Sequence, residues 1–274
     1  MSIGPILPSG TTLIYPMIGH PVVQVKSPTT FNRYFKEKEM DRVMVAMDIR
    51  PGYVEPFFSL LRGWENCPGC VVTIPHKQEA ARRVDELSPR ARDLGAVNVI
   101  RRTDDGRLTG DMVDGLGFLE ALARHGFDVR RKNIALFGAG GAGGAIAYAV
   151  ADAGAESITV IDTDIDRQHA LLDLLARRYP SVTLSDRLQS LARIDLAING
   201  TPLGMNGDPR TPFPLDTLDS HTLVADVVTE PEMTPWLKGA ESRGCPIQTG
   251  YEMTLGQFVL MARHMKIIEA VASL

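Results

Sequence analysis

The segment Ala135-Leu136-Phe137-Gly138-Ala139-Gly140-Gly141-Ala142-Gly143-Gly144-Ala145 joins an apolar run to a helix-like stretch. Three of its glycines have the spacing G-x-G-x-x-G, which allows a tight turn, close approach of backbone to a pyrophosphate, and close packing of a helix on a strand. The first N–H groups of the helix would face the phosphates. The pattern predicts a strand, a phosphate-binding loop and a helix. The loop residues predicted to bind the cofactor are Gly138, Ala139, Gly140, Gly141, Ala142 and Gly143.

A second apolar run over 157–161 ends at Asp162, which follows Gly138 by 24 residues. A carboxylate about 20 residues after the first glycine of this pattern accepts hydrogen bonds from the ribose hydroxyls of NAD. It also repels the additional phosphate of NADP. The alternative is a small-residue helix-packing motif followed by an ordinary aspartate at a strand end. The order of strand, loop, helix, strand and acid favours dinucleotide binding, with NAD as the predicted cofactor and NADP less favoured.

The composition limits the class of protein. A chain of 274 residues with 44% hydrophobic residues suggests about two domains with buried cores. The formal net charge is −4 and no basic run alternates with aromatic residues, so we expect no nucleic-acid partner. No apolar stretch reaches the roughly 18 residues that a membrane span needs, and no signal peptide is recognisable. We therefore expect a cytoplasmic protein that does not bind membranes.

The three cysteines are a sparse set that is typical of a reducing compartment. Cys67 and Cys70 have the C-x-x-C spacing of redox motifs, but they precede a strand-like run instead of opening a helix. No second pair could complete a zinc site, so we interpret them as a loop turn with two thiols. His76 has no partner at metal-ligand spacing, so it is interpreted as structural and no metal is expected.

Strand-like and helix-like segments alternate along the chain, which predicts an α/β fold with parallel sheets and right-handed crossovers. A hairpin is expected around Asp104-Asp105-Gly106. Ser27 is expected to cap a helix that has Pro28 at its first position. The expected strands are 13–18, 42–48, 71–74, 97–102, 107–110, 134–137, 157–161, 196–199, 223–227 and 247–249, with a weak strand near 182. The expected helices are 27–39, 56–62, 78–87, 89–94, 114–124, 165–178, 236–243 and 253–272, besides the one that follows the glycines. The first ten residues are expected to be poorly ordered.

Polar groups stand where three of these strands end, which is where open α/β sheets bind ligands. They are Thr73 to Lys77, Asn98, and Asp111 to Gly115. A lysine near an aspartate can move a proton to or from a substrate hydroxyl while a hydride leaves the carbon. The alternative is that Lys77 begins a solvated helix and Asp114 is a helix cap. The residues alone leave these two interpretations open.

Six motifs resemble the shikimate/quinate dehydrogenase family. They are Val72-Thr73-Ile74-Pro75-His76-Lys77, Gly95-Ala96-Val97-Asn98, Asp114-Gly115-Leu116-Gly117-Phe118, the glycine loop, Asn199-Gly200-Thr201-Pro202-Leu203-Gly204-Met205, and Gly250-Tyr251-Glu252-Met253 with Gln257. The resemblance implies an α/β substrate-binding domain over 1–113, which a C-terminal helix over 251–274 rejoins. It implies a Rossmann-type dinucleotide-binding domain over 114–250 and an active site in the cleft between the two.

The resemblance also implies residue roles. Lys77 and Asp114 would be the catalytic pair. The substrate-binding residues would be Ser27, Thr73, Asn98 and Gln257. Met205 and Gly250 would lie near the nicotinamide, and Thr201 and Val228 would also bind the cofactor.

Three departures from the family pattern affect its carboxylate side. Where the family usually has Ser-x-Ser-Pro, this chain has Val25-Lys26-Ser27-Pro28. Where it usually has Asn-Thr before the catalytic aspartate, this chain has Met112-Val113, and Thr229 stands where a tyrosine is common. A lost hydrogen bond to a charged group weakens binding by about 1.5–3 kcal/mol. We therefore expect the substrate to be a shikimate- or quinate-like cyclic polyol or a modified acid, with shikimate not the best substrate.

A fourth departure concerns the cofactor. NADP-using members resemble one another in an Asn-Arg-Thr stretch, where this chain has Asp162-Thr163-Asp164. Two acids would repel a 2′-phosphate, which again favours NAD. Two alternatives remain: a biosynthetic shikimate dehydrogenase, and a non-catalytic dinucleotide-binding sensor. A homodimer is possible.

Overall fold

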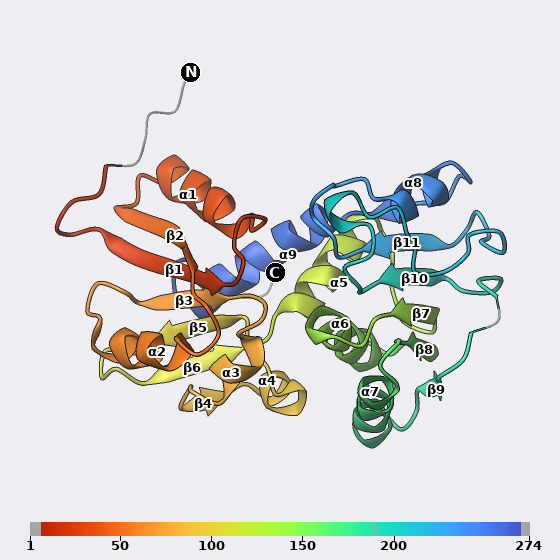
Figure 1. Cartoon of the computed structure of the whole chain (residues 1–274), viewed down its shortest axis with the longest axis horizontal. Helices are drawn as coiled ribbons and strands as arrows, with labels where there is room; N and C mark the ends of the chain where they lie inside the picture. The colour runs from red at the N-terminus through yellow and green to blue at the C-terminus, as the bar shows by residue number, and fades with distance from the viewer. Residues whose placement is uncertain (1–6, 189, 270–274) are drawn as a thin grey trace. The chain divides into compact units, whose positions relative to one another are not determined.

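The structure, a computed structural model, describes residues 7–188 and 190–269 of the chain (Figure 1). The chain divides into two compact units, Met1–Val113 with Phe258–Leu274, and Asp114–Gln257. The last helix ends at His264, so its predicted continuation is wrong for residues 265–269. Residues 270–272 of that prediction, and residues 1–6 of the predicted disordered start, lie outside the described residues.

The first unit contains a six-stranded mixed sheet in the order β2-β1-β3-β5-β6-β4. β1 pairs in parallel with β2 and β3, whereas β5 is antiparallel to β3 and to β6. The predicted hairpin around residues 104–106 is thus confirmed. The expectation of parallel pairing is confirmed for β1 with β2, β1 with β3 and β4 with β6, and it is wrong only for β5, which the hairpin joins to β6 in the antiparallel sense. The strands are β1 (Leu13–Gly19), β2 (Arg42–Asp48), β3 (Gly69–Val72), β4 (Glu86–Leu87), β5 (Val99–Arg102) and β6 (Leu108–Asp111).

Helices and an aromatic cluster stabilise this unit. Phe31 and Phe35, one turn apart on the first helix, are buried with Tyr15 of β1 and Met261 of the last helix. The rings of Phe31 and Phe258 meet edge to face with centroids 4.8 Å apart. The helices are α1 (Ser27–Glu37), α2 (Val54–Gly63), α3 (Lys77–Ala81), α4 (Pro89–Leu94) and the end of α9 (Gly250–His264).

The helix expected over 78–87 is wrong in its second half. α3 ends at Ala81, and Glu86 and Leu87 form β4, which pairs in parallel with β6. Asp85 gives the reason: its N–H donates to the Leu108 carbonyl oxygen at 2.9 Å, and its carboxylate accepts from the Leu108 N–H at 2.7 Å. These bonds to a neighbouring strand replace the helical bonds that this segment would otherwise make.

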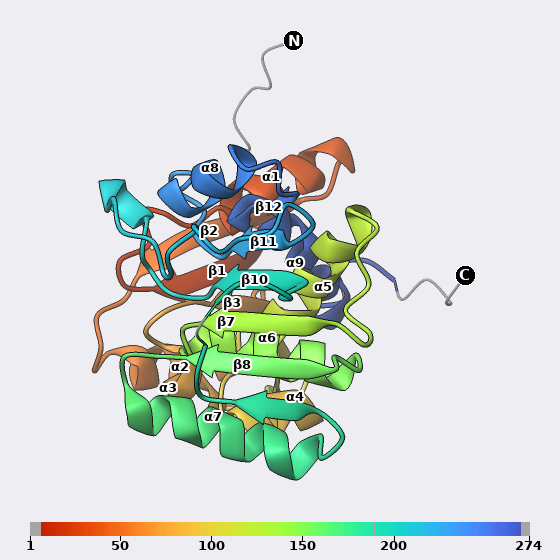
Figure 2. The ribbon, with the colours of Figure 1, turned by 90° about the vertical axis from the view of Figure 1, so that its right-hand side faces the viewer.

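The second unit contains a six-stranded sheet in the order β12-β11-β10-β7-β8-β9, and every pairing in it is parallel. Figure 2 shows β11, β10, β7 and β8 side by side. The strands are β7 (Asn133–Phe137), β8 (Ser157–Ile161), β9 (Thr183–Ser185), β10 (Leu196–Asn199), β11 (Leu223–Asp226) and β12 (Ile247–Gln248). The helices are α5 (Asp114–Arg124), α6 (Gly141–Asp152), α7 (Ile165–Arg178), α8 (Pro235–Glu241) and the start of α9, with a short 3-10 turn at Met205–Gly207.

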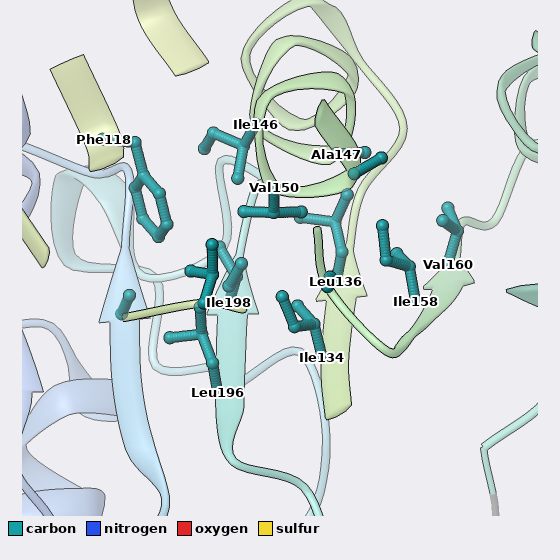
Figure 3. Packing of buried hydrophobic residues seen from close by; sticks show 14 of the residues in the cluster. Phe118, Ile134, Leu136, Ile146, Ala147, Val150, Ile158, Val160, Leu196 and Ile198 are labelled. Atoms are coloured by element: carbon teal, nitrogen blue, oxygen red, sulfur yellow. The ribbon is translucent and has the colours of Figure 1, made fainter. Parts of the chain in front are cut away.

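Alternate residues of the central strand β7 pack on opposite faces of this sheet. Ile134 and Leu136 join a cluster with Ile146 and Val150 of α6, as Figure 3 shows. Ala135 and Phe137 join the cluster on the other face, which includes Trp236 and Leu237 of α8. Helices therefore cover both faces, which explains why the central strands are continuously apolar in sequence.

Candidate functional site

The glycine loop follows β7 at the point where the strand order of the second sheet reverses, since β7 lies between β10 and β8. Ligands bind to open α/β sheets at such a position. Gly138 has a φ of +98°, and a Cβ there would lie 2.9 Å from the carbonyl oxygen of Gly200. A Cβ at Gly143 would lie 1.9 Å from the Gly138 carbonyl oxygen. Glycine is therefore required at both positions.

The middle of the loop has open space around its backbone. Gly140 is extended and precedes Gly141, the first residue of α6. No heavy atom of the described residues lies within 4 Å of a Cβ built at either glycine, apart from chain neighbours and the helix's own backbone. Bare backbone at the start of a twelve-residue helix offers N–H donors and a positive dipole end to an anion. The loop therefore fits the pyrophosphate of a dinucleotide.

Asp162 anchors the glycine loop from the end of β8. One carboxylate oxygen accepts from the Ala139 N–H at 2.6 Å and the other from the Asp164 N–H at 2.8 Å. The side chain is 6% exposed, and Arg167 lies 3.7 Å away. Each carboxylate oxygen has a second lone pair, so a ribose hydroxyl could still be bound. The ribose-binding role stays a prediction, whereas the anchoring role is visible.

A buried polar network holds the two loops that follow β10 and β11. Asp226 is fully buried, and one of its oxygens accepts from the Val228 N–H at 2.9 Å and from the Asn199 amide at 3.0 Å. Its other oxygen accepts from the Thr234 hydroxyl at 2.7 Å. The Asn199 side-chain oxygen accepts from the Thr201 hydroxyl at 2.6 Å. Burial raises the pKa of Asp226 to about 6, against the opposing effect of these donors.

This network brings several predicted cofactor residues together within the second unit. The methyl group of Thr201 would lie 2.7 Å from a Cβ at Gly138, so the loop after β10 touches the glycine loop. A Cβ at Gly250 would lie 2.3 Å from the Val228 carbonyl oxygen, so these two backbones are also in contact. Met205 follows Gly204, whose φ is +89°.

Asp226 and Asn199 had no predicted role. Each is a single polar residue at the end of a strand that is otherwise apolar and buried, and the two strands are neighbours. That repeated pattern is the signal that could have identified them.

In the first unit, Thr73, Lys77 and Asn98 gather where β3 ends and β5 begins. The Thr73 N–H donates to the carbonyl oxygen of Ile18 at 2.9 Å, and the Val97 N–H donates to the carbonyl oxygen of Lys77 at 3.0 Å. Asn98 is 1% exposed, and its side-chain oxygen accepts from the Val113 N–H at 2.9 Å. This bond orients the amide and ties Asn98 to the residue that precedes Asp114.

Ser27 occupies a different position from the one predicted. It is the first residue of α1, and Lys26 stands at the cap without a side-chain cap bond. The backbone of Lys26 is already near-helical, with φ −105° and ψ −19°, so the helix begins earlier and Pro28 becomes its second residue. The side chain of Ser27 is buried.

In the second unit, Asp114 and Gln257 lie on two closely packed helices. Asp114 begins α5 and is 3% exposed. One turn later, a Cβ at Gly117 would lie 2.8 Å from the backbone nitrogen of Gln257, so α5 and α9 touch backbone to backbone. This close contact sets the position of Gln257 relative to α5.

Three residues that depart from the family pattern, Val25, Met112 and Val113, are apolar and lie in apolar surroundings. Val113 is 1% exposed and belongs to the aromatic cluster of the first unit, and Val25 packs against the same cluster. Met112 is also buried. The first unit therefore has apolar side chains at two positions where the family pattern has hydroxyl groups.

The remaining candidates have structural explanations. The His76 ring is buried, and its Nε2 hydrogen-bonds the Ile49 carbonyl oxygen at 2.6 Å, which supports the structural interpretation. Burial raises the pKa of Cys67 to about 12 and that of Cys70 well above its usual value, so neither thiol is activated. Among the described residues, no group of three or more potential ligands could hold a metal ion, and no helix is long and apolar enough to span a membrane.

Three comparisons with known proteins agree with this geometry. The model of a family described as the shikimate dehydrogenase substrate binding domain matches residues 17–100. A relative from Lysinibacillus sphaericus named shikimate dehydrogenase (NADP(+)) is 31% identical over 257 residues, which cover 91% of each chain.

Two solved structures are similar over nearly the whole chain. Shikimate 5-dehydrogenase from Listeria monocytogenes, in complex with shikimate and NAD, is 27% identical with a TM-score of 0.87 and covers 96% of this chain and 94% of its own. The ligand-free 5-ketofructose reductase of a Gluconobacter strain is 27% identical with a TM-score of 0.84, and the match covers 92% of each chain.

Proposed function

Because this chain belongs to the shikimate dehydrogenase family, we propose that it interconverts a hydroxyl and a ketone on a cyclic polyol, with NAD as the preferred cofactor. Membership makes it an oxidoreductase that acts on a CH–OH group with NAD or NADP. In the proposal, the first unit binds the substrate, the second binds the dinucleotide, and the active site lies in the cleft between them. The observation that carries the proposal is the glycine loop, with its bare backbone at the switch point of a parallel sheet.

Lys77 and Asp114 are the proposed catalytic residues. The bound nicotinamide would accept the hydride from the carbon that carries the reacting hydroxyl. The Lys77 amine then takes the proton of that hydroxyl as the C=O bond forms, and Asp114 orients the amine and shares the charge. In the reverse direction the same ammonium group returns the proton to the ketone oxygen. Thr73, Asn98 and Gln257 are proposed to bind the other ring hydroxyls, and Ser27 the far end of the substrate.

The substrate class is proposed from the apolar side chains of Val25 and Val113, which replace hydroxyl groups of the family pattern. A carboxylate that lost hydrogen bonds at these positions would bind about 1.5–3 kcal/mol more weakly for each bond. A substrate that carries no charge there avoids this loss. The reductase from Gluconobacter acts, by its name, on 5-ketofructose, a neutral keto sugar, which supports a neutral or modified substrate within this fold. The alternative is the shikimate dehydrogenase activity by which the Lysinibacillus relative is named.

The NAD preference is proposed from charge. Asp162 and Asp164 follow β8, and the nearby cation Arg167 is paired with Asp164 at 2.9 Å. A 2′-phosphate would meet two carboxylates and an arginine whose charge is already balanced. The Lysinibacillus relative is named for NADP(+), so we expect this chain to differ from that relative in its preferred cofactor.

The test is a panel of quinate, shikimate, uncharged cyclitols and a neutral keto sugar, each offered with NAD and NADP or their reduced forms. We expect turnover with NAD, fastest on a member other than shikimate. Lys77→Ala should lower kcat by about 10²- to 10⁴-fold with little change in the KM for NAD. The matched control is Lys238→Ala, an exposed lysine on α8.

Wild-type turnover by Lys77→Ala would contradict the mechanism. NAD binding without turnover on any member would instead favour the non-catalytic sensor. The cytoplasmic location and the homodimer stay predictions.

A further inference from the structure

We propose that a pocket at one end of the first sheet binds a small organic anion, independently of the dehydrogenase site. The pocket lies where β1, β2 and β3 begin. Tyr15 comes from β1, Arg42 is the first residue of β2, and Pro68 directly precedes β3. Its volume is about 440 Å³, which is within the range of about 300–1,000 Å³ that small-molecule sites have.

The lining carries a positive charge that the protein itself balances only in part. Four cations line the pocket, with Asp104 as the single acid: Arg42, Arg101, Arg102 and Lys266. Arg102 is paired with Glu65 at 2.6 Å. Neither Arg101 nor Lys266 forms an ion pair within the described part of the chain. An anion in the pocket would supply the missing negative charge.

The hydroxyl group of a buried tyrosine provides the second observation. Tyr15 is 1% exposed and lines the pocket, yet its hydroxyl has no hydrogen bond to any described residue. Burial raises the pKa of this phenol, and the positive charge of Arg42 opposes the rise, so the hydroxyl is a neutral donor beside a cation. Such a donor suits a carboxylate or phosphate oxygen.

The apolar part of the lining indicates what else the ligand contains. Leu13, Pro68 and Met265 form walls beside the Tyr15 ring. A bare inorganic ion would leave these surfaces in contact with water, whereas a ring compound with one carboxylate or phosphate group would cover them. We therefore assign the pocket to a small ring compound that carries an anionic group.

This pocket is separate from the candidate site of the same unit. β1 runs from Leu13 to Gly19, and Gly19 contacts Thr73 at the other end of the sheet. A strand of that length spans roughly 20 Å. The anion site therefore does not depend on the proposed reaction.

The experiment is calorimetric titration of the full chain with benzoate and with phenyl phosphate, in the presence of saturating NAD. Benzyl alcohol is the uncharged control ligand. We expect binding of at least one anion with one site per chain, and none of benzyl alcohol. The double variant Arg101→Gln, Lys266→Gln should weaken binding at least about 10-fold. Tyr15→Phe, which keeps the ring and hence the fold, should weaken it by about 3- to 10-fold.

Arg177→Gln on α7, an exposed arginine outside the pocket, is the matched control and should bind as the wild type does. The proposal is overturned if neither anion binds at millimolar concentration or if the pocket variants bind normally. It is also overturned if saturating NAD abolishes binding, because the anion then occupies the glycine loop.

Discussion

The loops of the second unit and the sheet end of the first unit are built in different ways. In the second unit, the residues predicted to bind the cofactor are held by backbone contacts and by a buried polar network around Asp226. In the first unit, the positions that depart from the family pattern are filled by Val25 and Val113, which pack in an aromatic and aliphatic cluster. One region is specified by hydrogen bonds and sterics, the other by apolar packing.

This difference bears on how each region can change. A backbone that touches another backbone leaves no room for a side chain, and a buried donor or acceptor cannot lose its partner without cost. Apolar positions of similar volume exchange more easily. We infer that the cofactor-binding loops tolerate few substitutions, whereas the residues that select the substrate can be exchanged more easily.

The largest effect should come from the glycine loop. Gly143→Ala places a Cβ 1.9 Å from the Gly138 carbonyl oxygen, so we expect a loss of about 4 kcal/mol or more in unfolding free energy, with loss of NAD binding. Gly144→Ala is the matched control, because its Cβ would have no neighbour closer than 3.9 Å, and helix propensity should make it neutral or slightly stabilising. Chemical denaturation of both variants checks this. Equal stability of the two would show that the loop is not sterically constrained.

The next effect concerns Asp226. Its pKa is raised to about 6 in the folded protein, so the folded state binds more protons than the unfolded state between about pH 4 and 6. The stabilising contribution is thus fully present below about pH 4 and is lost as the pH rises through about 6. Relative to Asp226→Asn, the wild type should lose about 3 kcal/mol of unfolding free energy from pH 4 to pH 7. Denaturation curves at several pH values measure this, and a pH-independent difference would contradict the assignment.

Adding hydroxyl groups to the first unit should raise the activity on shikimate. Val25→Ser with Val113→Thr restores two hydroxyls, so kcat/KM for shikimate should rise by about 10- to 100-fold. The buried hydroxyl at position 113 should reduce stability by about 1–2 kcal/mol. Val45→Thr, on the exposed part of β2, is the control and should change neither kinetics nor stability appreciably. An unchanged substrate preference in the double variant would show that Val25 and Val113 do not select the substrate.

The smallest effect should be on the preference between NAD and NADP. Replacing Asp162-Thr163-Asp164 by Asn-Arg-Thr removes two negative charges and adds a positive one, so the ratio of kcat/KM for NADP to that for NAD should rise about 10-fold or more. Asparagine at 162 retains an oxygen that can accept from the Ala139 N–H, so the glycine loop should keep its anchor. Steady-state kinetics with both cofactors checks this. A wild type that already prefers NADP would contradict the NAD proposal.

The fold and most candidate positions were predictable wherever the signal was local. The glycine spacing predicted β7, the loop and α6 correctly, because each glycine is needed for a local steric reason. Continuous apolar runs predicted the parallel strands of the second sheet. Local signals failed at residues 82–87, where hydrogen bonds from Asp85 to Leu108 override helix propensity, and at Ser27, where the backbone of Lys26 starts the helix early.

The dinucleotide-type loop, the alternating α/β order and the polar residues at strand ends could be predicted from the amino-acid sequence, because these features depend on neighbours along the chain. Which of these groups support one another depends on how the strands pack in three dimensions. Asp226 became the centre of a network because its strand and that of Asn199 lie side by side, and Tyr15 faces basic residues that stand far from it in sequence. Spacing along a chain cannot encode such contacts, since they form only when separate strands pair and bury their side chains together.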